Sequence, residues 1–263
     1  MNLAGRSVLV TGATGGIGQA IARAFAAEGA QLVLTGRRAE VLEPLAAEVG
    51  GRSIACDLSS ASELDRLLSE VGNAEVLVSN AALPASGDVG SFTVEEVDRA
   101  LAVNLRAPII LARALSAGMA ARGHGHIVFL SSLSGKAASP RGSIYAATKY
   151  GLRGFALGLR EDLRDTGVGV STVFPGFIKG AGMFHDSGVK LPGYVALRTP
   201  EDVAAAVRKA IERNRSEIDV APLALRLGTA LAGIAPELSG RVQRRLGGVD
   251  IAEALTEGQR DKR

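Results

Sequence analysis

The chain has 263 residues, of which 47% are hydrophobic and 22% charged, and its formal net charge of +3 is too small to indicate nucleic-acid binding. A single cysteine, Cys56, excludes an intrachain disulfide and is expected to be a small buried residue. Arg6 interrupts the N-terminal apolar segment, and no run of about 18 uncharged apolar residues is present, so we expect a cytoplasmic protein without a signal peptide or a membrane-spanning helix.

Short apolar runs alternate with helical patterns along the chain, which indicates one soluble α/β domain. We predict strands at residues 7–11, 31–35, 52–56, 75–79, 126–131, 168–174 and 218–220. We predict helices near residues 17–28, 39–49, 60–70, 94–121, 143–165 and 200–213. This alternation, with right-handed crossovers, gives a Rossmann-type doubly wound parallel sheet of about seven strands with helices on both faces. Ligands of such a sheet bind beyond the carboxyl ends of its strands.

The first predicted strand leads into a glycine-rich segment, Thr11-Gly-Ala-Thr-Gly-Gly-Ile-Gly18, and a helical pattern follows it. Glycines allow backbone N–H groups to approach a pyrophosphate, and a helix N-terminus favours an anion. A glycine cluster alone also fits a simple tight turn, but this one lies between a strand and a helix. We therefore predict a dinucleotide phosphate site. Its residues are Gly12, Thr14, Gly16, Ile17 and Gly18.

The end of the second predicted strand indicates which dinucleotide binds. Gly36 stands where an NAD-preferring protein carries an acidic residue for the ribose 2′-hydroxyl, so no carboxylate repels a 2′-phosphate. Arg37 and Arg38 follow, and their guanidinium groups can pair with that phosphate. The alternative is that both arginines are solvated residues opening a helix. We predict a preference for NADP(H), with NAD(H) possible.

Tyr145 and Lys149 are four residues apart, so one face of a helix can carry both side chains. A neighbouring ammonium favours the phenolate, so we expect Lys149 to lower the pKa of Tyr145. The hydroxyl of Ser132, thirteen residues before Tyr145, can hold a substrate oxygen beside the phenol. A Tyr-x-x-x-Lys pair alone is common on ordinary helices. With the serine it predicts proton transfer to or from a carbonyl or alcohol oxygen.

These motifs together resemble the short-chain dehydrogenase/reductase family, of the compact single-domain type, over residues 5–221. Further positions match the family pattern in chain order: Asp57 with Leu58, Asn80 with Ala81, Asn104, and Pro175 with Gly176 and Ile178. The glycine spacing also fits the extended branch of the family, but too little chain follows Pro175 for that branch. Where many relatives place a threonine for the nicotinamide carboxamide, this chain has Lys179-Gly180, and a backbone contact from Ile178 is the alternative.

The resemblance implies an NADP(H)-dependent carbonyl reductase or alcohol dehydrogenase. Tyr145 exchanges the proton, Lys149 lowers its pKa and reaches the nicotinamide ribose, and Ser132 holds the substrate oxygen. Asn104 supports a water that relays protons to Lys149, and Asp57 contacts the adenine. The neighbouring Ser131 is an alternative to Ser132. A non-catalytic NADP(H)-binding regulatory or scaffold protein is the competing interpretation, but it would not need all four catalytic residues.

Residues 177–198 are expected to form a mobile lid over a small carbonyl or alcohol substrate. Apolar lid residues that can line the substrate pocket are Phe177, Ile178, Met183, Phe184, Leu191, Tyr194 and Leu197. Lys179, His185 and Lys190 can meet an acidic end of the substrate. The alternative is that these side chains only pack the lid. The three histidines do not have the spacing of metal ligands, so we predict no metal.

The dinucleotide-binding and catalytic domain is predicted at residues 1–221, and residues 222–263 are predicted to be a helical C-terminal extension. Residues 223–235 are apolar with a single charge, Arg226, and more arginines follow. We expect the extension to pack on its own domain or on a partner subunit of a homodimer or homotetramer. A helix on an anionic membrane surface is the alternative. Thirteen residues are too few to span a membrane.

Overall fold

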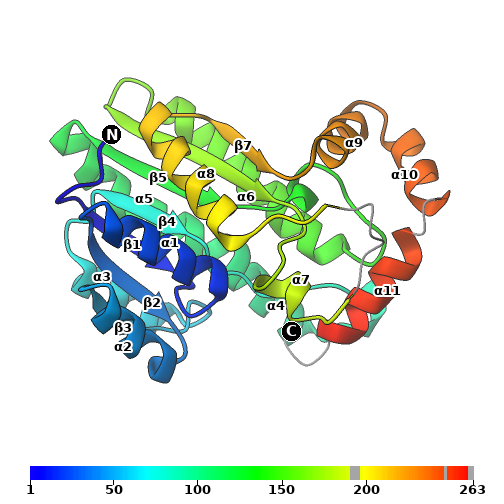
Figure 1. Cartoon of the computed structure of the whole chain (residues 1–263), viewed down its shortest axis with the longest axis horizontal. Coiled ribbons are helices and arrows are strands. Elements are labelled where there is room, and N and C mark those ends of the chain that lie inside the picture. Colours follow the sequence, from blue (N-terminus) through cyan, green and yellow to red (C-terminus); the bar gives the residue numbers. More distant parts are fainter. Residues whose placement is uncertain (190–195, 246–247, 260–263) are drawn as a thin grey trace.

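The computed structural model describes residues 1–189, 196–245 and 248–259. Its sheet is parallel and has seven strands in the order β3-β2-β1-β4-β5-β6-β7 (Figure 1). The strands are β1 (Ser7–Thr11), β2 (Gln31–Gly36), β3 (Arg52–Ala55), β4 (Val76–Ser79), β5 (Gly125–Leu130), β6 (Val168–Pro175) and β7 (Glu217–Val220). The predicted doubly wound sheet is confirmed, and each predicted strand lies within one residue of its observed bounds.

Helices cover both faces of the sheet. They are α1 (Gly16–Ala27), α2 (Ala39–Glu48), α3 (Ala61–Val71), α4 (Val94–Leu101), α5 (Ala107–Arg122), α6 (Ser143–Asp162), α7 (Gly182–His185) and α8 (Pro200–Arg213). Neighbouring residues of one strand point to opposite faces, so Val8 and Val10 pack with α1, α2 and α8, whereas Leu9 packs with α3, α5 and α6. The two apolar layers fix the strands in register, and with them the rim at their carboxyl ends.

The predicted long helix at 94–121 is a continuous run of three pieces. A π-helical segment, η2 (Ala102–Arg106), joins α4 to α5. The run Val94–Arg122, whose most apolar 18-residue window has a mean hydropathy of 1.4, is the one helix in the described part of the chain long and apolar enough to cross a membrane. It is a core helix instead, because Leu111, Leu115 and Met119 are buried against the sheet.

The extension after β7 forms three helices, α9 (Leu223–Ile234), α10 (Pro236–Arg245) and α11 (Gly248–Gln259), which lie to one side of the sheet (Figure 1). No residue of α9 is buried. Its exposed large apolar residues are Leu223, Leu227, Leu231 and Ile234. Packing of the extension on a partner subunit, and the domain boundary at residue 221, stay predictions.

His126 in β5 makes the fold sensitive to acid. Its Nε2 lies 2.8 Å from the Ser171 hydroxyl, and burial lowers its pKa from 6.5 to about 3. Between these values the unfolded chain binds a proton that the folded chain does not, so lowering the pH favours unfolding by roughly 1.4 kcal/mol per pH unit. Unfolding the parent and His126→Gln in urea at pH 7 and pH 5 should show about 2 kcal/mol less loss of stability in the variant.

The matched control for this measurement is His185→Gln, because His185 is exposed on α7. That variant should lose stability with falling pH as the parent does. An equal loss in the parent and His126→Gln would contradict a neutral buried imidazole.

Candidate active site

Four of the predicted site segments meet at one edge of the sheet. Thr11, Asn80, Ser132 and Pro175 lie at or just after the carboxyl ends of β1, β4, β5 and β6, which are consecutive in the sheet. Residues up to 164 positions apart in sequence therefore share one rim, as the strand pattern predicted.

The first glycine turn is held rigidly by the end of β4. Gly12 has φ +66°, and a Cβ there would lie 2.7 Å from the Cα of Ala81. The Asn80 side-chain amide donates to the carbonyls of Thr11 at 3.0 Å and Gly12 at 3.1 Å. The Thr11 hydroxyl accepts from the N–H groups of Asn80 and Ala81. Asn80 and Ala81 therefore fix the shape of the glycine turn. The part that the Thr11 hydroxyl plays in this support was not predicted from the sequence.

The N-terminus of α1 is open to an anion. No side chain caps this helix, and its first turn carries no acidic residue. A Cβ on Gly18 would lie 2.3 Å from the Gly12 carbonyl, and one on Gly16 would lie 2.2 Å from the Cβ of Ala181. These glycines keep the helix end close to the turn and to the segment after β6. Uncapped N–H groups beside a close backbone approach are what a pyrophosphate requires.

The end of β2 lies against the Thr14 side chain. A Cβ on Gly36 would lie 2.8 Å from Cγ2 of Thr14, so a longer side chain here would require Thr14 to move. Arg38 is exposed and donates from Nη2 to the Thr14 carbonyl at 2.8 Å. This arginine thus braces the glycine turn, a role that the sequence did not indicate.

Asp57 lies after β3, next to buried Leu58. Burial raises the pKa of its carboxyl, but hydrogen bonds from the N–H and hydroxyl of Ser59, and the Arg37 guanidinium, outweigh it and lower the pKa. The carboxylate is therefore ionised and fixed in orientation at neutral pH. Exposed Arg37 lies close enough to act on it, so both belong to the same end of the site.

The structure brings Ser132, Tyr145 and Lys149 together. Tyr145 is in the first turn of α6, and the Ser132 hydroxyl lies close enough to its phenol to act on the pKa of that group. Lys149 is 1% exposed, with Nζ 5.6 Å from the centre of the Tyr145 ring, and it donates to the Leu130 carbonyl at 2.9 Å. The helical spacing predicted this contact correctly.

The predicted direction of the Tyr145 pKa is wrong for this structure. Burial raises the pKa of Tyr145 to about 12, against the lowering effect of the Ser132 hydrogen bond, and burial lowers the pKa of Lys149 to about 8. The Lys149 ammonium lies over the ring and bonds to a carbonyl, whereas desolvation acts on the phenol itself. Sequence spacing gives the neighbour of a group but not its burial.

Ser131 is not equivalent to Ser132. Its hydroxyl is buried and donates to the Lys149 carbonyl at 3.1 Å. The chain then turns through η3 (Leu133–Gly135), where a Cβ on Gly135 would lie 2.8 Å from the same carbonyl oxygen. Ser131 therefore fastens α6 to the end of β5, and Ser132 is the serine that meets the phenol.

Asn104 is fully buried within the π-helical segment η2. Its side chain accepts from the Leu83 N–H at 2.6 Å and donates to the Leu83 carbonyl at 2.9 Å. A longer contact of 3.5 Å reaches the hydroxyl of Thr148, the neighbour of Lys149. Asn104 thus ties η2 to the loop after β4 beside the catalytic helix. The π-helical segment, a feature frequent at functional sites, had no signal in the sequence periodicity.

Backbone contacts join the two ends of the segment after β6. Ile178 is buried and forms a parallel bridge with Arg198, and the Lys179 N–H donates to the Arg198 carbonyl at 2.8 Å. Gly176 donates its N–H to Val220 in β7. Pro175, Gly176 and Ile178 therefore lie at the rim, and the Lys179 N–H is already bonded.

The predicted lid residues divide by exposure. Phe177 and Phe184 pack with ring centres 5.0 Å apart. Met183 and Leu197 are also half-buried, whereas Lys179 and His185 are exposed. Lys190, Leu191 and Tyr194 lie outside the described residues. Within residues 1–189, 196–245 and 248–259 no group of three or more His, Cys, Asp or Glu could hold a metal ion.

Comparisons with known proteins agree with this geometry. The family model described as short chain dehydrogenase matches residues 6–190. The ketoacyl reductase HetN of Nostoc sp. (strain PCC 7120) is 34% identical over 98% of this chain and 94% of its own length. The NADP-dependent 3-hydroxy acid dehydrogenase YdfG of Escherichia coli (strain K12) is 35% identical over 76% of this chain and 86% of its own.

Solved structures of related dehydrogenases are also similar to this chain. A short-chain dehydrogenase from Sphingobium yanoikuyae in complex with NADPH has a TM-score of 0.78 and 28% identity, covering 89% of this chain and 94% of that chain. The closed form of a serine dehydrogenase complexed with NADP+ has a TM-score of 0.75 and 31% identity, covering 83% and 95%.

Proposed function

This chain belongs to the short-chain dehydrogenase/reductase family, and from that premise we propose that it is an NADP(H)-dependent reductase of a small carbonyl compound. The observation that carries the proposal is the placement of Ser132 beside the Tyr145 phenol, with the Lys149 ammonium over the ring, on the rim that also holds the glycine turn. When bound, NADP(H) supplies the hydride.

The residues of this rim fit the proposed cofactor. The uncapped N-terminus of α1 and the close glycine contacts suit the pyrophosphate. Gly36 places no acidic side chain at the end of β2, and Arg37 and Arg38 are exposed beside it for a 2′-phosphate. Two related structures hold NADPH or NADP+, which supports the same choice.

The protein supplies the proton and the orientation of the substrate. Ser132 would hold the carbonyl oxygen of the substrate. Tyr145 would donate its phenol proton to this carbonyl oxygen as the carbonyl oxygen gains negative charge. A pKa of about 12 keeps the phenol protonated at neutral pH, which suits reduction. The pKa of Lys149, about 8, is close to neutral pH, so this ammonium can pass a proton on. Asn104 supports the adjoining wall of the site.

The substrate we propose has an apolar body. Phe177, Met183 and Phe184 gather on the segment after β6 and give it apolar surface. Two relatives are named for ketoacyl groups and 3-hydroxy acids, so 3-oxoacyl compounds lead the candidates. The buried free thiol of Cys56 supports a reducing compartment, so we place the enzyme in the cytoplasm. We propose that it is a homodimer or homotetramer.

The experiment is a panel of 3-oxoacyl esters, ketones and aldehydes mixed with NADPH, followed by loss of absorbance of the reduced nicotinamide. We expect turnover with at least one 3-oxoacyl or apolar ketone substrate. NADPH binding without turnover of any member would instead favour the non-catalytic sensor or scaffold.

A further inference from the structure

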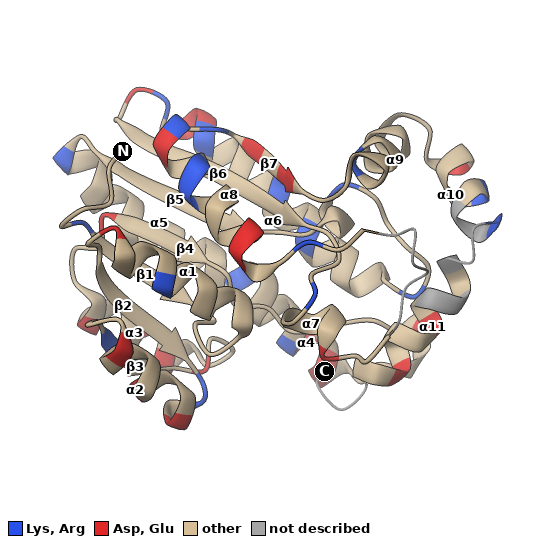
Figure 2. Cartoon of the chain, in the orientation of Figure 1, with Lys and Arg blue, Asp and Glu red and all other residues tan. Residues whose placement is uncertain are grey.

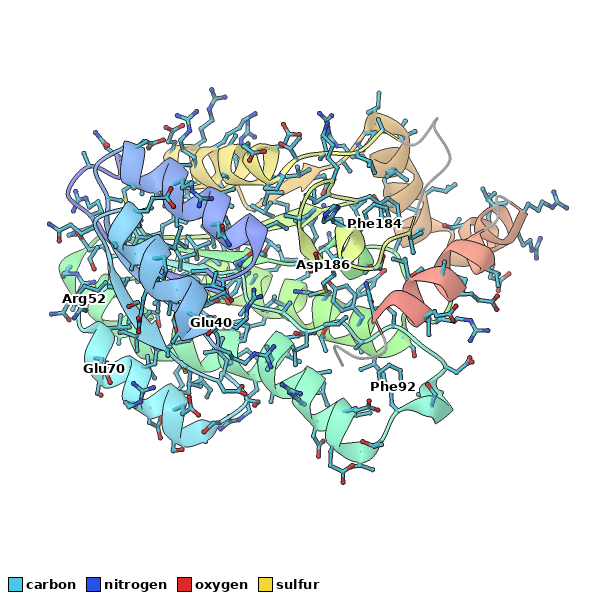
Figure 3. The ribbon with its side chains drawn as sticks, turned by 60° about the horizontal axis from the view of Figure 1, so that its bottom comes forward. Glu40, Arg52, Glu70, Phe92, Phe184 and Asp186 are labelled. Carbon is cyan, nitrogen blue, oxygen red and sulfur yellow. The ribbon has the colours of Figure 1, made fainter. Side chains whose placement is uncertain are left out.

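Helix α11 of the extension returns to the segment after β6. The Gln259 side-chain amide donates to the Met183 carbonyl in α7 at 3.2 Å. One residue earlier, a Cβ on Gly258 would lie 2.2 Å from the carbonyl oxygen of Ser187. Figure 1 shows α11 beside α7, and Figure 3 shows Phe184 on the side of the body that faces the extension. The last helix therefore touches the segment predicted to cover the substrate.

A second contact of α11 involves Arg141, which lies just before the catalytic helix α6. Arg141 has φ +56°, which is rare for a residue with a side chain and often marks a functional position. Its carbonyl accepts from the Gly87 N–H at 2.6 Å. Its guanidinium pairs with Asp88 and, at 2.7 Å, with Glu253 on α11, which bears acidic residues (Figure 2).

Arg141 anchors the entry to the catalytic helix. The N-cap residue of α6, Gly142, provides no side-chain hydrogen bond to the first turn. The entry to the helix is instead held by the backbone and guanidinium bonds of Arg141, four residues before Tyr145. One residue thus links the catalytic helix to the loop after β4 and to α11.

The surface beside α11 has two open depressions. One, of about 270 Å³, is lined by Arg141, Glu253, Thr256 and Glu257. The other, of about 440 Å³, is lined by Ser187, Gly188, Val189, Ala254, Glu257 and Gly258. The close contacts of α11 with the rest of the chain include those at Glu253, Gly258 and Gln259.

We propose that α11 forms the outer wall of the substrate site, and that Gly258 and Arg141 are positioning residues. Gly258 sets α11 against the segment after β6, and Arg141 ties α11 to the loop after β4 and to the start of the catalytic helix. This inference rests on the proposed reductase function. It makes the extension part of the active unit: loosening the contacts of α11 weakens substrate binding, whereas the hydride step and cofactor binding depend on the residues of the rim.

Two helical glycines of the extension give a matched test. Gly258→Ala must move α11 away from Ser187, whereas Gly228→Ala on α9 meets nothing within 4 Å. Both changes favour helix formation equally. With the best substrate of the panel, Gly258→Ala should raise KM about fivefold and leave kcat and the Kd of NADPH nearly unchanged. Gly228→Ala should match the parent in all three.

A second variant removes the charge without changing shape. In the parent, KM should rise with salt because the Arg141–Glu253 pair is exposed enough to be screened. Glu253→Gln should raise KM at low salt and abolish this dependence, whereas Glu212→Gln, which breaks a surface pair on α8, should retain it. The inference is overturned if an active parent, Gly258→Ala and Glu253→Gln share one KM and one salt dependence. A parent that reduces no carbonyl would instead overturn the proposed function.

Discussion

Tyr145→Phe is expected to reduce turnover about 10²- to 10⁴-fold while NADPH affinity stays close to that of the parent. The change removes the phenol hydroxyl that Ser132 holds and keeps the ring that packs beside Lys149. Hydride transfer then leaves a charged oxygen without its proton donor. Steady-state NADPH oxidation with the best panel substrate measures the loss, and titration of NADPH fluorescence measures binding.

The same helix supplies the control. Tyr150 follows Lys149 directly but is 41% exposed, so Tyr150→Phe should retain parental kcat and KM. Turnover by Tyr145→Phe within tenfold of the parent would remove this phenol from the mechanism. Loss of NADPH binding together with activity would point to a structural role instead.

The fold could be predicted because its signals are local. Buried parallel strands are short apolar runs, and glycine turns mark their ends, so the strand order along the chain follows from the sequence. The site at the rim then follows from topology, since Thr11, Asn80 and Ser132 each come at a strand end. The Tyr145–Lys149 contact follows from the helical repeat.

Other features of the site could not be predicted, because they depend on the three-dimensional surroundings. The pKa of Tyr145 rises with burial, which the four-residue spacing does not reveal. The left-handed conformation of Arg141 is held by Gly87, Asp88 and Glu253, more than fifty residues away on either side. An arginine in that conformation has no signature in a single sequence, because glycine and asparagine are the usual residues there.

Replacing Arg37 and Arg38 together with glutamine is expected to weaken NADPH binding by about ten- to a hundredfold and NADH binding much less. Pairing of the two guanidinium groups with the 2′-phosphate is a charge-assisted contact of about 1.5–3 kcal/mol in total, and 1.4 kcal/mol corresponds to a factor of ten. NADH has no 2′-phosphate and loses neither contact. Fluorescence titration of each reduced cofactor gives both constants, and Arg208→Gln, a surface variant on α8, is the control.

The two single variants should differ, because only Arg38 also braces the glycine turn through the Thr14 carbonyl. Arg37→Gln should affect NADPH alone, whereas Arg38→Gln should weaken NADPH strongly and NADH slightly. Added salt should reduce the difference between the NADPH and NADH affinities of the parent, since exposed charges are screened. A parent that binds NADH as tightly as NADPH would contradict this prediction, because Gly36, Arg37 and Arg38 would then not discriminate between the two cofactors.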